Sequence, residues 1–369
     1  MKQWLLKYLR CPACASAFSV SAVKQRDAVL SSVESGFLQG SARNNADYTS
    51  DIDEGVLQCE QCALIFPIIQ GVPRIYKDAA HDYPVNHGLE NVGSVEGAKH
   101  EKHVQTSFTR EWDEFNYDDQ TIWLWTLDHR VETFCEELGI SSPAELKGKL
   151  MVDAGCGSGI LSMTLAERYG VEIIAMDMSH VITRAARRNK SNLCHFVQCS
   201  VLNPPLAKGI ADVTYSHGVL HHTYNTKKAF DAIAPLTKKG GVLYVWLYGR
   251  KKGWNRFRFL FIRSARFVIA RLPRIPQTIM VYVMTVVHLT VRFIKRMLGM
   301  EKVQYKTMAQ FLVSMRDKYT PLYAREHGEA EVKQWFEEAG FINVERRLDW
   351  PKTPWWRGST DLSIRGRKG

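Results

Sequence analysis

The sequence predicts an α/β protein built on a Rossmann-like, mostly parallel seven-stranded sheet with helices on both faces. Apolar, strand-like segments alternate with amphipathic, helix-like segments between residues 150 and 248, which is the pattern of a covered parallel sheet. A glycine-rich turn, VDAGCGSG at 152–159, joins the first strand to a helix. A helix at 329–339 and strands at 341–348 and 361–365 are expected to close the sheet with an antiparallel edge pair.

The predicted elements divide the chain into five parts. Strands are expected at 150–153, 171–177, 194–199, 211–216 and 241–248, and helices at 159–169, 179–191 and 226–238. The predicted boundaries are an N-terminal module at 1–78, a linker at 79–104, the main core at 105–249, a basic helical insertion at 250–300 and the end of the core at 301–369.

Composition indicates a globular protein with one unusual segment. Of 369 residues, 45% are hydrophobic and 24% charged, which is typical of a chain that buries a core. The net charge of +11 is concentrated between residues 250 and 300, which contain twelve Lys or Arg and no Asp or Glu. Such a segment favours an anionic partner: lipid headgroups, nucleic acid or a phosphorylated substrate.

Targeting signals and cysteine usage predict the compartment. The first apolar run is broken by charges and leads directly into a C-P-x-C, so no signal peptide is expected. The eight cysteines do not have the pattern of a disulfide framework. We therefore expect a reducing, cytoplasmic setting, and membrane association through 250–300 is the alternative that the basic segment leaves open.

The glycine-rich turn has the features of a nucleotide-cofactor loop. Glycines allow a sharp turn and close approach of a ligand, and the following helix offers free backbone N–H groups. Asp177 ends the next strand, 22 residues after Gly155, where a carboxylate can bind ribose hydroxyls. The G-x-G-x-x-G pattern of nicotinamide-binding loops is missing, since its third glycine, counted from Gly155, would be residue 160, which is Ile. The adjacent Asp153 would repel a pyrophosphate but suits a cationic ligand.

This run, together with 196–205 and 216–223, resembles class I S-adenosylmethionine-dependent methyltransferases over residues 105–249 and the elements after 329. The resemblance implies S-adenosylmethionine as cofactor, with Asp153 and the loop glycines at its methionine part and Asp177 at its ribose. The family usually has Asp where this chain has Ser200, at the adenine amine. The implied cofactor-binding residues are Asp153, Gly155, Cys156, Gly157, Gly159, Asp177, Met178, Ser200, Val201 and His217.

Two C-x-x-C pairs in the N-terminal module predict a metal site. Each pair presents two thiolates from a tight turn, and the two pairs together complete a tetrahedral zinc site. The residues are Cys11, Cys14, Cys59 and Cys62. A thioredoxin-like redox pair would need one C-x-x-C in a βαβ context. Residues 57–75 are similar to the small zinc-ribbon proteins that partner methyltransferases, and the zinc is expected to be structural.

Candidate catalytic residues follow the fourth and fifth strands. Ligands bind at the carboxyl ends of strands in such sheets, where His217, His221, His222 and Tyr248 are expected. Methyl transfer mainly needs alignment of the acceptor, and an oxygen acceptor usually also needs a base. The aromatic segment with Phe108, Trp112 and Phe115 either covers the cofactor or packs as an ordinary helix.

The basic insertion predicts an amphipathic helical hairpin. On a helical wheel, Phe261 and Val268 lie on one face, and Arg263, Arg266 and Arg271 lie on the opposite face. The uncharged stretch 275–291 is short and polar for a membrane-spanning helix. The alternatives are a hairpin at the membrane interface or over the active site, lid helices with solvated arginines, and a nucleic-acid contact.

The function predicted from these features is methyl transfer to a small or lipid-linked acceptor, most readily at oxygen. The first alternative is an RNA methyltransferase that uses the zinc ribbon and basic helices as RNA contacts. The second is a non-catalytic, cofactor-binding scaffold.

Overall fold

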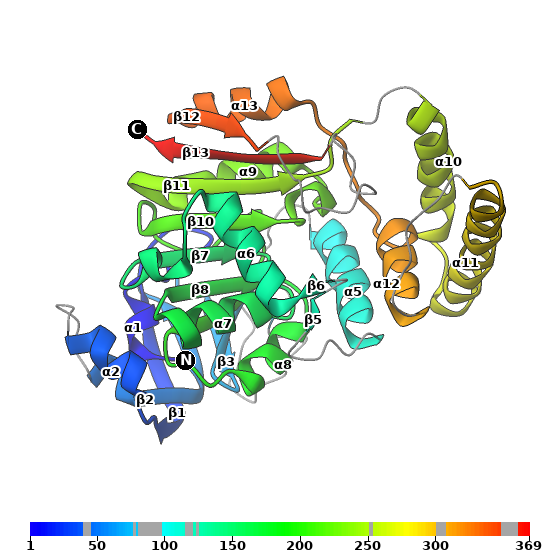
Figure 1. The fold of residues 1–369 in the computed structure, drawn as a ribbon. Helices are drawn as coiled ribbons and strands as arrows, with labels where there is room; N and C mark the ends of the chain where they lie inside the picture. Colours follow the sequence, from blue (N-terminus) through cyan, green and yellow to red (C-terminus); the bar gives the residue numbers. More distant parts are fainter. Residues whose placement is uncertain are drawn as a thin grey trace.

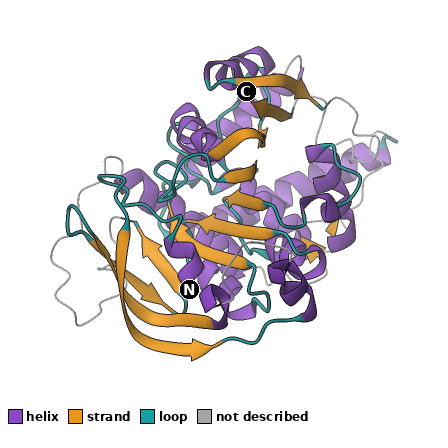
Figure 2. Cartoon of the chain, turned by 90° about the vertical axis from the view of Figure 1, so that its left-hand side faces the viewer, coloured by secondary structure: helices purple, strands orange, loops and turns teal. Residues whose placement is uncertain are grey.

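A computed structural model describes residues 1–39, 46–76, 79, 98–114, 121–122, 125–250, 254–299, 308–347 and 361–369. Its main sheet has eleven strands in the order β1-β2-β3-β4-β9-β8-β7-β10-β11-β13-β12 (Figure 1). Helices cover both faces of this sheet (Figure 2). The predicted fold class is confirmed, and the methyltransferase-like part contributes seven of the eleven strands.

Those seven strands follow the predicted arrangement. β7 to β11 are parallel to one another, and β13 is antiparallel to both of its neighbours, β11 and β12. The expected antiparallel edge pair is therefore present. The strands are β7 Leu150–Ala154, β8 Glu172–Asp177, β9 Cys194–Cys199, β10 Ala211–His217, β11 Thr237–Leu247, β12 Phe341–Arg346 and β13 Leu362–Lys368.

Capping residues in the sequence account for several helix ends in the methyltransferase-like part. Ser142 and Glu145 form a capping box at the turn after α6, and Gly139 and Gly170 end α6 and α7 in the left-handed conformation that glycine adopts without strain. The α-helices are α6 Leu127–Leu138, α7 Ile160–Tyr169, α8 Val181–Arg188, α9 Thr226–Ile233 and α13 Glu329–Glu338, and the 3-10 turns are Pro143–Leu146, Leu220–His222 and Ala234–Leu236.

The N-terminal module extends the sheet instead of standing apart from it. Its last strand, β4, pairs in parallel with β9, with Arg74 opposite Gln198 and Ile75 opposite Cys199. This pairing covers an edge that would otherwise expose unpaired backbone groups, and it raises the strand count above the predicted seven. The module contains α1 Gln3–Leu6, β1 Phe18–Asp27, α2 Ser32–Gln39, α3 Ala46–Thr49, β2 Ser50–Cys59, β3 Ile65–Ile69 and β4 Val72–Ile75.

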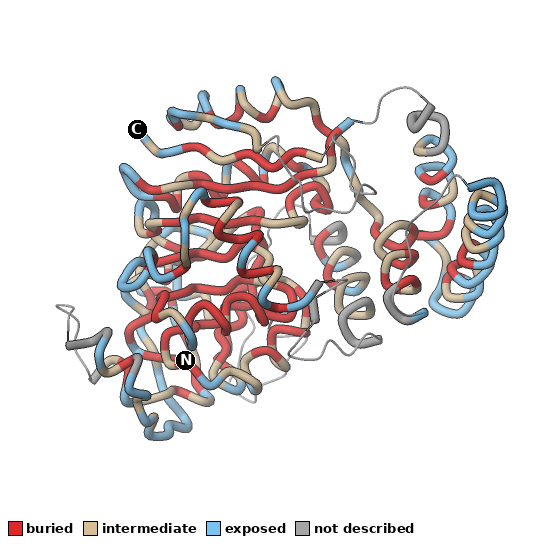
Figure 3. Tube along the Cα trace, viewed as in Figure 1, coloured by how far each residue is buried: buried red, intermediate tan, exposed pale blue. Residues whose placement is uncertain are grey.

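Buried polar and aromatic contacts join the module to the rest of the sheet. The Arg74 guanidinium is fully buried and donates to the Gln198 Oε1 at 2.7 Å. The Trp4 ring stacks on the His195 ring with centroids 4.4 Å apart. Buried residues run without interruption from the module into the central strands (Figure 3). The module and the core therefore share one hydrophobic interior.

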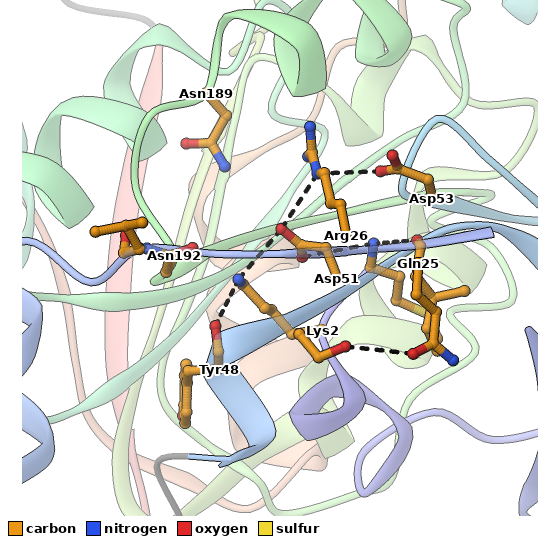
Figure 4. A network of polar contacts seen from close by, with 12 residues as sticks. Lys2, Gln25, Arg26, Tyr48, Asp51, Asp53, Asn189 and Asn192 are labelled. Atoms are coloured by element: carbon orange, nitrogen blue, oxygen red, sulfur yellow. Dashed lines mark hydrogen bonds and ion pairs between the residues drawn. The ribbon is translucent and has the colours of Figure 1, made fainter.

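Within the module, a charged network holds the first residues against β2. The Lys2 ammonium lies 3.2 Å from the Asp51 carboxylate and donates to the Tyr48 carbonyl at 2.6 Å (Figure 4). Arg26 bridges the same Asp51 to Asp53, at 3.6 and 3.2 Å. Because Lys2 and Asp51 are largely shielded from water, the ion pair between them is stronger than an exposed one such as those of Arg26, whose side chain is 62% exposed.

Helix α5, Ala98–Glu114, begins inside the predicted linker, residues 79–104. Phe108 packs edge-on against His222, with ring centroids 5.2 Å apart, so this helix does reach the candidate site. The side chains of Trp112 and Phe115 lie outside the described residues. A short hairpin, β5 Thr121–Ile122 and β6 Trp125–Thr126, follows α5.

Three helices between β11 and α13 form a separate lobe beside α5 (Figure 1). They are α10 Trp254–Ile269, α11 Arg274–Met297 and α12 Met308–Tyr319, here called the inserted helices. They have a small core of their own, which includes Ile269, Val281 and Met315. Among the described residues, α11 alone is long and apolar enough to cross a membrane, by length and composition only.

Candidate functional site

A cavity of about 480 Å³ lies at the carboxyl ends of the parallel strands. Its walls come from α5, the glycine-rich loop, the ends of β8 to β11, and the inserted helices α10 and α12. Open α/β sheets bind their ligands at this edge. Most of the predicted cofactor residues line it: Asp153, Gly155, Cys156, Gly157, Asp177, Met178, Ser200, Val201 and His217.

Backbone conformation and close packing require glycine at two positions of the loop. Gly155 has φ +93°, and a Cβ there would lie 2.3 Å from a Val219 methyl carbon. Gly159 has φ +70° at the start of α7, and its Cβ would meet the Phe196 ring at 2.7 Å. Gly159 is not among the described residues that line the cavity. Its place indicates that it packs the helix onto the sheet.

Two carboxylates flank the loop. Asp177 accepts hydrogen bonds from the Gly157 N–H at 2.8 Å and from the Ser179 N–H at 2.8 Å, which fixes the acid against the loop. Asp153 accepts from the Ser162 hydroxyl at 2.5 Å. Burial raises the pKa of Asp153 to about 6, so a cationic group beside it would stabilise its charged form.

A buried charged cluster closes the floor of the cavity. Arg130 donates to the Glu137 carboxylate at 3.1 Å and to the Tyr215 hydroxyl. The His217 Nδ1 lies 3.0 Å from the other Glu137 oxygen. Burial opposes ionisation, yet Arg130 and His217 hold the pKa of Glu137 well below its usual range. Arg130 and Glu137 were not predicted from the sequence, because α6 shows no motif and only the fold brings these side chains to Tyr215 of β10.

His222 and Tyr248 meet a third polar residue that the sequence did not indicate. The Tyr248 hydroxyl donates to the Asp317 carboxylate at 3.1 Å, and the His222 Nε2 lies 3.8 Å from the same carboxylate. The His222 Nδ1 lies 2.8 Å from the Tyr323 carbonyl oxygen. The side chains of His222, Tyr248 and Asp317 line the cavity. Asp317 belongs to α12.

His221 occupies a different position from its neighbour. It is fully buried, and neither ring nitrogen has a hydrogen-bond partner among the described residues. Its ring packs on Tyr248, with centroids 3.9 Å apart. Burial lowers its pKa well below the usual range. Since it is not among the described residues lining the cavity, it supports Tyr248 from behind.

The far end of the cavity is built by the inserted helices. Phe259, Ile262 and Val313 supply apolar walls, and Arg266 lines the same region. Arg266 is 7% exposed and donates to the Lys318 carbonyl at 2.8 Å. The helical-wheel faces are thus reversed at this position: Arg266 turns inward, while Phe261 and Val268 are 58% and 57% exposed. Arg266 is therefore an exception to the solvated arginines expected for lid helices, whereas Arg263 and Arg271 are exposed.

The four predicted zinc ligands come together in the N-terminal module. The sulfur atoms of Cys11, Cys14, Cys59 and Cys62 all lie within 4.8 Å of one another. A tetrahedral zinc ion with Zn–S bonds of about 2.3 Å needs sulfur atoms slightly less than ~4 Å apart. Four thiolates complete the coordination, so the cluster fits a structural zinc ion.

Comparison with known families identifies both parts of the chain. Residues 152–245 match the methyltransferase domain family, and residues 2–71 match the family of Trm112p-like proteins. The chain thus has a methyltransferase domain preceded by a Trm112p-like zinc-ribbon module. The predicted resemblance is confirmed, including the cofactor class, S-adenosylmethionine, and the structural zinc.

The matches to individual relatives span only part of each relative's length. A ubiquinone biosynthesis O-methyltransferase of Rhodopseudomonas palustris is 30% identical over 131 residues, 35% of this chain and 50% of the relative. One from Pectobacterium carotovorum is 31% identical over 153 residues, 40% of this chain and 61% of the relative. The chain thus spans about half to three fifths of these curated relatives.

Solved structures with a related fold are more distant. A Haemonchus contortus phospholethanolamine N-methyltransferase 2 is 14% identical with a TM-score of 0.43, covering 71% of this chain and 56% of that chain. A Burkholderia thailandensis 1,6-didemethyltoxoflavin-N1-methyltransferase is 15% identical with a TM-score of 0.41, covering 75% and 92%. Likenesses this remote carry no information on the acceptor.

Proposed function

We propose that this protein transfers a methyl group from S-adenosylmethionine to a small or lipid-linked acceptor, at an oxygen atom. The observation that carries the proposal is one continuous cavity with two chemically different ends. The glycine-rich loop, Asp153 and Asp177 line one end, and His222, Tyr248 and Asp317 line the other. The curated relatives named as O-methyltransferases support oxygen as the acceptor atom.

The cofactor end has the groups that such a ligand requires. S-adenosylmethionine, when bound, supplies a methyl group on a cationic sulfonium. Asp153 would face the cationic methionine part, Arg130 its carboxylate, and Asp177 the ribose hydroxyls. Arg130 lines the cavity although Glu137 already pairs with it, and that pairing keeps the guanidinium ion in place for a second anion.

His222 is the candidate general base. Because its Nδ1 faces the Tyr323 carbonyl at 2.8 Å, that nitrogen carries the proton, and the Nε2 of the neutral ring is available as an acceptor. Burial lowers the His222 pKa, which keeps the ring neutral. When the Nε2 takes the acceptor's proton, the Asp317 carboxylate at 3.8 Å stabilises the imidazolium.

The inserted helices offer a surface suited to lipid. Along α11, apolar side chains at helical spacing form one exposed stripe: Ile275, Ile279, Tyr282, Val286, Phe293 and Met297. The helix is about 36 Å long at ~1.5 Å per residue. Exposed basic residues flank it, among them Arg271 and Arg296, and no acid lies between residues 250 and 300. We therefore propose that α11 lies on an anionic membrane surface.

A transfer assay tests the proposed activity. Purified protein with radiolabelled S-adenosylmethionine and a whole-cell extract should label the lipid or small-molecule fraction. The Asp177→Ala variant should lose cofactor binding and labelling together. Label confined to RNA would instead establish the RNA methyltransferase alternative. Cofactor binding without label in any fraction would favour the non-catalytic scaffold.

Vesicle sedimentation tests the membrane surface. The wild type should sediment with phosphatidylglycerol vesicles and much less with phosphatidylcholine vesicles. Replacing Ile279 and Val286 by Glu should weaken binding at least about tenfold, since both burial of apolar area and charge attraction are lost. Val29→Glu is the matched control, because Val29 is 90% exposed in the N-terminal module. Equal binding of the two variants would contradict a docking role for α11.

A further inference from the structure

Helix α5 brings a buried carboxylate to the end of β9. Glu101 is 9% exposed, lines the cavity and accepts a hydrogen bond from the Ser200 hydroxyl at 2.5 Å. Burial raises the pKa of this carboxyl group. The Lys228 charge acts in the opposite direction, but no described cation forms an ion pair with this carboxylate. A buried acid costs free energy unless it is paired or has a ligand to bind, so its place in the cavity needs an explanation.

One helical turn later, a second polar side chain faces the same cavity. Gln105 is 5% exposed and lines the cavity. Its Nε2 has no hydrogen-bond partner among the described residues. Residues four apart lie on one face of a helix, so Glu101 and Gln105 present an acceptor and a donor side by side. An unmet buried donor is destabilising, and a ligand acceptor would satisfy it.

The order of the strands places this pair relative to the cofactor. β7, β8 and β9 are neighbours in the sheet, spaced about 4.8 Å apart. The glycine-rich loop follows β7, Asp177 ends β8, and Ser200 follows β9. If Asp177 holds the ribose, as in the proposed function, the base extends toward the end of β9. Val201 and Leu202 line the cavity there and offer it an apolar surface.

We propose that Glu101 and Gln105 of helix α5 recognise the edge of the adenine base, with Glu101 in place of the acid that the family carries at position 200. Glu101 accepts a hydrogen bond from the exocyclic amine, and the Gln105 amide donates to a ring nitrogen. Ser200 orients the carboxylate through its hydroxyl. Helix α5 is fixed for this role because the Thr109 hydroxyl accepts from the His180 N–H at 3.1 Å.

This arrangement predicts discrimination at purine position 6. A 6-oxo base would direct a carbonyl oxygen at the Glu101 carboxylate, and two acceptors repel. The test compares S-adenosylhomocysteine with S-inosylhomocysteine by calorimetry on the full chain. The wild type should bind the adenosyl compound roughly tenfold to a hundredfold more tightly. Glu101→Gln, whose amide both accepts and donates, should lower this ratio several-fold.

Matched variants separate this inference from the proposed function on which it rests. Glu132→Gln makes the same chemical change at an exposed side chain and should leave the ratio unchanged. Gln105→Met keeps the side-chain length and should weaken both compounds several-fold. An unchanged ratio in a folded Glu101→Gln variant that binds S-adenosylhomocysteine would overturn the inference alone. Failure of the wild type to bind S-adenosylhomocysteine would overturn the proposed function with it.

Discussion

The two additions to the methyltransferase domain differ in how they are attached. The N-terminal module joins the sheet by strand pairing, and its buried residues belong to the same hydrophobic cluster as the central strands. The inserted helices form a cluster of their own and reach the domain mainly through the walls of the cavity. The shared core ties the module to the stability of the fold, whereas the separate insertion would contact the acceptor under the proposed function.

Removing the zinc should have the largest effect on the stability of the protein, and it tests whether the module stabilises the whole domain. Purified protein is expected to contain about one zinc per chain. Cys11→Ser, at a site 2% exposed, should abolish metal binding and cost on the order of 10 kcal/mol of module stability. Because the module shares the sheet and the core, the whole methyltransferase domain should lose stability, measured as a lower melting temperature.

A chelator on the wild type is the matched treatment, and Cys135→Ser, outside the cluster, is the control variant. If zinc-free protein kept its melting temperature and its affinity for S-adenosylhomocysteine, the module would be a separate appendage. The comparison between the two additions would then fail.

Two cavity-creating substitutions should sharpen the same contrast. Trp4→Ala removes a ring that is 1% exposed and stacked on His195, and should destabilise the main unfolding transition by about 3–5 kcal/mol. Ile269→Ala, also 1% exposed, should cost about 2–5 kcal/mol, but only within the inserted helices. Hydrogen exchange by region checks this. Equal loss of protection in the central strands of both variants would show a single cooperative unit.

Asp317→Asn should give a smaller effect, confined to the reaction. The variant removes the charge that stabilises a protonated His222, so kcat should fall about tenfold while affinity for S-adenosylhomocysteine stays constant. Asp128→Asn, 84% exposed, is the matched control. His222→Gln should lower kcat further, by roughly a hundredfold or more. A loss of cofactor affinity equal to the loss of rate would point to a structural role instead.

The pH dependence of the rate distinguishes a proton-accepting role of His222 from a purely structural one, because only the first would shift the profile. Under the proposed function His222 acts as a base in its neutral form, and burial lowers its pKa, so the rate should persist below pH 6.5 and decline only in more acidic buffer. Asp317 acts to raise that pKa. Asp317→Asn should therefore move the acidic limb of the rate profile to still lower pH. An unshifted limb would exclude His222 as the group that titrates.

The sequence by itself determined the fold class, the glycine-rich loop and the zinc ligands, because each depends on local order. Apolar periodicity specifies strands and helices, and positive φ angles at Gly155 and Gly159 require glycine in the turn. Each C-x-x-C turn places two zinc ligands within four consecutive residues, so the ligand pairs can be recognised from the sequence. His222 and Tyr248 were predictable for a similar reason, since both follow parallel strands whose ends meet at one edge.

Tertiary structure alone decided which distant side chains complete the site. Glu101, Arg130 and Asp317 stand on helices without motifs, and they reach the cavity because α5, α6 and α12 pack around it. The inward turn of Arg266 and the exposed stripe of α11 were equally hidden, since a helical wheel shows two faces but not which one is buried. Which face of a helix is buried depends on the element that packs against it, and only the tertiary structure shows that element.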